Sequence, residues 1–132
     1  MRLLLLISRT AGIVAAVLAV VAAVAAAAAV PSTPTEALVS ELWRCVGLIT
    51  WAALFVLLAA RPQLLALWVI ALSSKIALVV VGLAIGLGTP GAGDLVLWDG
   101  ILSLVLAVGS VACIRVRTLE RPATSAQPPM RE

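Results

Sequence analysis

The stretch AGIVAAVLAVVAAVAAAAAV, residues 11–30, decides the fold because it contains twenty residues without one polar side chain. A helix rises 1.5 Å per residue, so about twenty apolar residues cross the roughly 30 Å hydrocarbon core of a bilayer. The rest of the chain agrees: 64% of its 132 residues are hydrophobic and 11% are charged, against roughly 45–50% and 25% in soluble domains. We expect one domain that has lipid as its solvent.

Three further apolar segments follow, at residues 42–60, 64–88 and 95–114. Each is about as long as a membrane-crossing helix, and none alternates polar and apolar residues as the strands of a membrane barrel do. Stretches rich in proline and glycine separate the segments and end the helices. The sequence therefore predicts an all-α integral membrane protein, an antiparallel four-helix transmembrane bundle over residues 11–114.

The segments outside the spans are short. Residues 1–10 are expected to form an N-terminal segment, and the polar tail at 115–132, which contains three prolines, is expected to be disordered. The link Arg61-Pro62-Gln63 is so brief that the second and third spans are predicted to pack as a tight antiparallel hairpin.

Arginines mark one side of this topology. Six of them fall on the same side of a four-span chain, namely Arg2, Arg9, Arg61, Arg115, Arg117 and Arg121. The positive-inside rule then places both termini in the cytoplasm, with the arginines at the start of the tail against anionic headgroups. These arginines explain the net charge of +3. We therefore expect the lipid bilayer, and not a nucleic acid, as the partner. The alanine-rich first span and the preference for arginine over lysine are typical of high-GC bacteria and favour a bacterial inner (plasma) membrane.

The first span has an alternative interpretation. Its charged start and the alanines before Pro31 also resemble a secretory signal peptide with an A-x-A cleavage site. Twenty apolar residues exceed the usual 7–15 of a signal peptide, which favours an uncleaved anchor. Mass spectrometry of the mature N-terminus distinguishes the two, since a start near residue 30 would leave three spans.

Residues for catalysis or cofactor binding are scarce. The chain contains no histidine, and its two cysteines, Cys45 and Cys113, fall near opposite ends of their spans. Haem, zinc and di-iron sites depend largely on histidine or on cysteine clusters, and no Gly-rich phosphate loop or nucleophile elbow is present. We expect no catalytic residue, no cofactor and no metal site, and hence no enzyme.

Lys75 is the candidate site residue that stands out, because it is the only lysine and lies in the middle of the third span beside Ser73 and Ser74. A charge at the centre of a membrane span costs about 2.5–3.5 kcal/mol on insertion scales and is a functional hypothesis by default. Gly82 and Gly86 lie within about 20° of Lys75 on a helical wheel. Their G-x-x-x-G spacing predicts a helix-packing face.

The fourth span carries Asp99 and Ser103 on one helix face. If the third and fourth spans are level at their midpoints, Lys75 lies level with Ser103, and Asp99 lies about 8 Å farther out. We therefore predict that Arg44 pairs with Asp99, and that Lys75 is bonded to Ser103, to backbone carbonyls or to water. In the first span, Ala15, Ala19, Ala23 and Ala27 are predicted to form a close-packing seam.

Two functions remain open. The first is a non-enzymatic accessory or assembly subunit that packs through small-residue helix faces against itself, as a homo-oligomer, or against a larger membrane protein. The second is a small oligomeric transporter or permease in which Lys75 attracts an anion or exchanges a proton.

Overall fold

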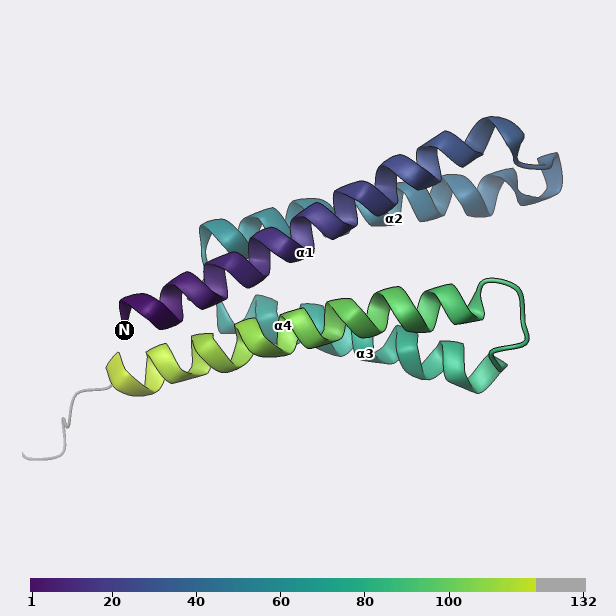
Figure 1. Ribbon diagram of the computed structural model, residues 1–132. Coiled ribbons are helices and arrows are strands. Elements are labelled where there is room, and N and C mark those ends of the chain that lie inside the picture. Colours follow the sequence, from purple (N-terminus) through teal and green to yellow (C-terminus); the bar gives the residue numbers. More distant parts are fainter. Residues whose placement is uncertain (121–132) are drawn as a thin grey trace, which may run out of the picture.

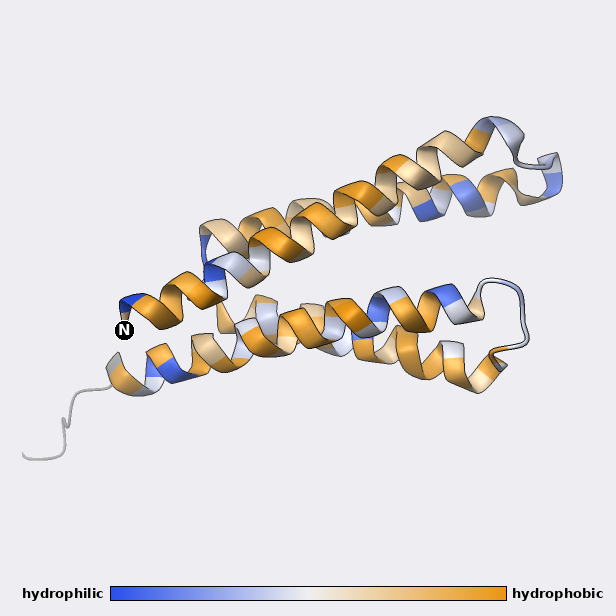
Figure 2. Ribbon diagram, in the orientation of Figure 1, coloured by the Kyte–Doolittle hydropathy of each residue, from blue (hydrophilic) through white to orange (hydrophobic). Residues whose placement is uncertain are grey.

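The described chain is built from four helices, α1 (Arg2–Ala29), α2 (Thr35–Ala60), α3 (Leu65–Ile85) and α4 (Ala92–Glu120), with one 3-10 turn, η1 (Val30–Ser32). The computed structural model describes residues 1–120, and that part of the chain contains no strand. All four helices are long and apolar enough to cross a membrane, and Figure 2 shows apolar residues along the length of each. The predicted all-helical class is confirmed for residues 1–120, as is the prediction of four helices long and apolar enough to span a membrane.

The helices extend beyond the predicted spans. α1 begins at Arg2 because residues 3–7 are strong helix formers. α2 begins directly after Pro34, a residue that fits the entry to a helix but not its interior. α4 continues to Glu120, and the side chain of Val116, near the end of this helix, is buried. The prediction that residues 115–120 are disordered is therefore wrong, while 121–132 lie outside the described residues.

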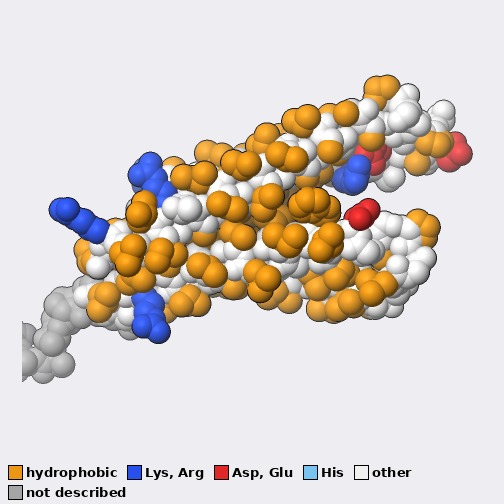
Figure 3. All heavy atoms as spheres, viewed as in Figure 1, with side chains coloured by type: hydrophobic (Ala, Val, Ile, Leu, Met, Phe, Trp, Pro, Cys, Tyr) orange, Lys and Arg blue, Asp and Glu red, His pale blue; other side chains and the backbone are white. Residues whose placement is uncertain are grey.

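The helices pack as two pairs, α1 with α2 and α3 with α4, and the contact of α1 with α4 joins the pairs (Figure 1). The predicted tight packing of the second span on the third is wrong, since α2 and α3 are not among the closely packed pairs. The reason is that small residues allow α2 and α3 to pack closely against other helices. Gly12 holds α2 against α1, and Gly82 holds α3 against α4. The pairs part toward the end that carries the turns at residues 30–34 and 86–91 (Figure 3).

Small side chains on α1 form much of the core. Ala11, Ala15, Ala19 and Ala26 are buried, and a Cβ added to Gly12 would lie 2.9 Å from the Cα of Ala59. The predicted alanine seam is therefore half right: Ala15 and Ala19 belong to it, Ala23 is half-buried and Ala27 is exposed. Larger side chains complete the core, namely Phe55, Leu58, Trp68 and Leu106. Many other leucines, valines and isoleucines are exposed, as the lipid-facing surface of a membrane protein requires.

Candidate functional site

Lys75 of α3 forms an ion pair with Asp99 of α4. The lysine Nζ lies 2.7 Å from the Asp99 Oδ1, and the two side chains are only 5% and 10% exposed. An unpaired charge in this apolar setting would be strongly unfavourable. The carboxylate and the ammonium group therefore neutralise each other inside the bundle.

The predicted pairing of Arg44 with Asp99 is wrong. Arg44 instead donates two hydrogen bonds to Glu41, one turn earlier on α2, and its side chain is 57% exposed. The error lies in the reach assumed for the lysine side chain, because α3 and α4 lie at nearly the predicted levels. A Cβ on Gly82 would lie 2.7 Å from Val96, so Lys75 and Asp99 are separated along the bundle by roughly 6 Å, which the four-carbon stem of lysine spans.

Trp51 brings a third helix to the ion pair. The Lys75 Nζ lies 4.9 Å from the centroid of a Trp51 ring on α2, within the range of a cation–π interaction. The Trp51 ring in turn packs at 5.6 Å from that of Phe55, which is fully buried. The α2 and α3 helices are not closely packed. The contact between Trp51 and Lys75 nevertheless joins them directly at this depth.

The serines near the ion pair bond to their own helices. Ser103 donates to the backbone carbonyl of Asp99 at 2.7 Å, and the Lys75 ammonium pairs with the Asp99 carboxylate and not with the Ser103 hydroxyl as one predicted option required. Ser73 and Ser74 donate to the carbonyls of Ile70 and Ala71, one turn back on α3. The three hydroxyls thus donate to their own helices, and the charge partner of the Lys75 ammonium is Asp99.

The two glycines of the predicted packing motif have different roles. Gly82 is buried against Val96, as a packing residue should be. Gly86 ends α3 with a φ of 89° and has no atom within 4 Å of where a Cβ would stand. The assignment of Gly86 to a packing face within the chain is therefore wrong, because its positive φ serves the helix end.

Three further contacts were not predicted from the sequence. Ser8, fully buried on α1, donates to the carbonyl of Gly109 on α4 at 3.1 Å. The Trp68 ring lies where a side chain on Gly109 would stand, and the Trp68 Nε1 donates to the Pro62 carbonyl at 2.9 Å. A serine in a leucine-rich start and a glycine late in the fourth span were the only signals for these contacts.

The remaining features give no sign of a chemical centre. Two grooves on the surface are lined almost entirely by apolar side chains, one between α1 and α2 and one between α1 and α4. Within residues 1–120 no group of three acidic, histidine or cysteine side chains could hold a metal ion, and every buried polar side-chain atom there has a hydrogen-bond partner. Comparisons with protein-family models, curated proteins and solved structures found no match to this chain.

Proposed function

We propose that this protein is a non-enzymatic accessory or assembly subunit of a membrane complex. The observation that supports this function best is the Lys75–Asp99 pair. Both charges are satisfied within the chain and are shielded from the surroundings. A lysine held in this way ties helices together and has no free charge to offer a substrate.

The proposed arrangement is an antiparallel bundle in a bacterial inner membrane, with both termini in the cytoplasm. Short connections between successive helices and the arginines at one end of the molecule (Figure 3) support it. Reporter fusions at residue 1 and after residue 132 test it. Alkaline phosphatase activity at either end, in place of green fluorescence, would contradict a cytoplasmic location for that end.

The proposed partner is a second copy or a larger membrane protein that packs against the outer helix faces. Gly47 of α2 and Gly100 of α4 have open space where a side chain would stand. Glycines on a lipid-facing helix allow a neighbouring backbone to approach closely. These two positions are therefore where we expect contact with the partner.

Affinity purification in a mild detergent, followed by native gels, tests this function. We expect a stable assembly that is weakened by Gly47→Leu or Gly100→Leu, and that is retained by Ala53→Leu, a matched change at an exposed position of α2. A protein that remains monomeric, with no co-purifying membrane protein, would contradict the proposal.

A small transporter is the second candidate, and one observation favours it. Lys75 and Asp99 are both ionisable and lie within membrane-spanning helices that part toward one end of the molecule, and such residues can carry protons or ions. The test is ion or proton flux into liposomes containing the purified protein. Flux in the wild type that is abolished in the charge-free double variant Lys75→Met/Asp99→Leu, with assembly intact, would favour transport over the accessory function.

A further inference from the structure

Two arginines flank the contact between α1 and α2. Gly12 of α1 touches the backbone of Ala59 of α2. Arg9 lies one turn before Gly12, and Arg61 directly follows the end of α2, with its backbone N–H bonded to the Leu57 carbonyl. In the antiparallel arrangement proposed above, both arginines lie beyond the Gly12–Ala59 contact, toward the same end of the molecule. They are therefore at about the same depth.

Both guanidinium groups are available to a ligand. Arg9 and Arg61 are exposed, and neither forms an ion pair with any carboxylate of the described residues. The other arginines on this side lie farther out. The hydrogen bond from Ser8 to Gly109 sets the levels of α1 and α4, and Arg2 and Arg115 each lie six residues, about 9 Å, beyond it.

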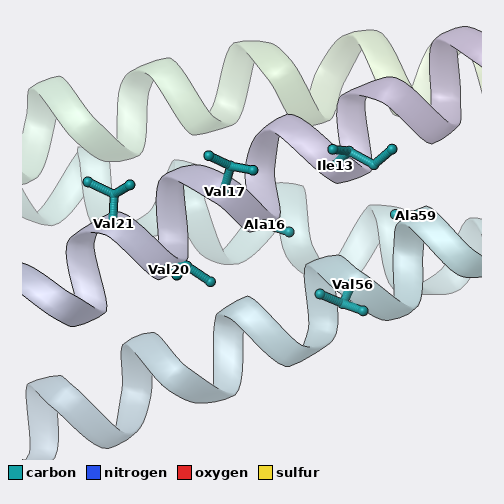
Figure 4. Close-up of a pocket in the computed structure, with 7 residues that line it drawn as sticks. All are labelled: Ile13, Ala16, Val17, Val20, Val21, Val56 and Ala59. Atoms are coloured by element: carbon teal, nitrogen blue, oxygen red, sulfur yellow. The ribbon is translucent and has the colours of Figure 1, made fainter.

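An apolar groove begins next to this arginine pair. It runs along the outside of α1 and α2, and its lining includes Ile13, Ala16 and Val20 from α1 and Val56 and Ala59 from α2 (Figure 4).

Arg9 continues the α1 side of this groove toward the end of the molecule. At 100° per residue, Arg9 lies within about 40° of Ile13, Ala16 and Val20 on the helix. On α2, Arg61 follows the groove residue Ala59 by two positions. The positive charge therefore stands at one end of an otherwise apolar channel.

We propose that this site binds one anionic phospholipid, with its phosphate between Arg9 and Arg61 and an acyl chain in the groove. Guanidinium groups suit phosphate oxygens, and basic sites between helices on the cytoplasmic side are known to take anionic headgroups. The distance along α1 from Arg9 to Val20 is about 17 Å, close to half of the roughly 30 Å hydrocarbon core. The groove thus matches the acyl chain of one leaflet.

The groove between α1 and α4 is a poorer fit. Its lining includes the polar Thr10 together with Leu6, Val14 and Val108. Arg2 lies one turn before Leu6, whereas Arg115 lies two turns after Val108. It therefore serves as a control for a groove with only one cation within a turn of its lining.

Native mass spectrometry of the full chain in detergent, titrated with phosphatidylglycerol, tests the site. We expect one tightly held lipid in the wild type. At about three- to fivefold in affinity for each arginine, Arg9→Gln/Arg61→Gln should weaken phosphatidylglycerol binding roughly 10- to 30-fold. Arg2→Gln/Arg117→Gln removes the same charge from outer positions and should leave the binding within about twofold of the wild type.

Three further measurements distinguish the contribution of the headgroup to binding from that of the groove. Phosphatidylcholine should bind more weakly than phosphatidylglycerol, and inorganic phosphate should not displace the bound lipid. Val20→Phe, which fills the α1–α2 groove, should reduce binding, whereas Val14→Phe in the other groove should not. Circular dichroism verifies that each variant is folded.

Specific results would overturn the proposal. Equal losses in the two arginine double variants would mean that only overall charge matters. Equal binding of phosphatidylcholine would show that the arginines do not select the headgroup, and displacement by inorganic phosphate would show that the groove contributes nothing.

Discussion

The ammonium group of Lys75 and the carboxylate of Asp99 meet at 2.7 Å across the α3–α4 interface, with the Trp51 ring of α2 beside them. Three helices are thus connected at one depth by one lysine. Lys75, whose charge looks unfavourable in an apolar segment of the sequence, therefore connects helices in the fold.

Removing either partner of this pair should destabilise the protein severely. Lys75→Met leaves a buried carboxylate, and Asp99→Asn leaves a buried ammonium group, so each should cost about 3–5 kcal/mol. The double variant Lys75→Met/Asp99→Leu should recover most of that loss, because no charge remains unpaired. The fraction that stays monodisperse after heating in detergent measures the effect. A double variant as unstable as the sum of the singles would contradict the pairing.

Trp51 should contribute a smaller amount than the ion pair. Trp51→Leu keeps an apolar side chain but removes the cation–π contact, at an expected cost of about 0.5–2 kcal/mol. Trp43→Leu is the matched control on the same helix, because the Trp43 side chain is 73% exposed. Thermal unfolding in detergent should separate the two variants, and equal midpoints would show that the Trp51 contact is without effect.

Gly109 should tolerate no larger side chain. The Trp68 ring occupies the space of a Cβ at this position, whereas Gly100, on the same helix, has nothing within 4 Å. Gly109→Leu should therefore displace Trp68 and cost several kcal/mol through overpacking, while Gly100→Leu should leave the monomer folded. Yield and peak shape in size-exclusion chromatography report the difference. A well-folded Gly109→Leu variant would be inconsistent with this packing.

Gly86 should matter through its backbone alone. Its φ of 89° is unfavourable for any residue with a Cβ, although no atom would clash with one. Gly86→Ala should cost about 1–2 kcal/mol, and Gly88→Ala, in the same turn but without a positive φ, should be nearly neutral. Thermal midpoints of the two variants provide the comparison, and identical values would contradict a role for the positive φ.

Arg44 should be almost dispensable for stability. It pairs with Glu41 on the surface of its own helix, and exposed pairs of this kind contribute about 0–1 kcal/mol. Arg44→Gln should thus change the unfolding midpoint far less than Asp99→Asn. A large effect of Arg44→Gln, similar to that of Asp99→Asn, would restore the arrangement in which these two residues are partners.

The membrane class and the number of helices could be predicted because they depend on properties that the sequence carries locally. The twenty apolar residues at 11–30 specify a spanning helix by length and composition alone. Lys75 could be singled out for the same reason, since its position within an apolar run needs no knowledge of neighbouring helices.

The partners of Lys75 could not be predicted, because they depend on where its long side chain reaches between neighbouring helices. Levelling α3 and α4 at their midpoints placed Lys75 near Ser103, and the Gly82–Val96 contact sets nearly the same level, but the lysine stem extends about 6 Å along the bundle to Asp99. The packing of α1 on α4 was missed for a related reason. Its signals are the hydroxyl of Ser8 and the missing side chain of Gly109, which acquire meaning only when the two helices are adjacent.

The α1–α4 contact determines at what stage of synthesis the helical bundle can close. The hydrogen bond between Ser8 and Gly109 joins residues 101 positions apart, so the ribosome must deliver nearly the whole chain before the bundle can close. Until then α1 and α2 have only each other, and the ion pair of Lys75 forms only after α4, which carries Asp99, has joined α3. The last helix to emerge is the one that brings both halves of the molecule together.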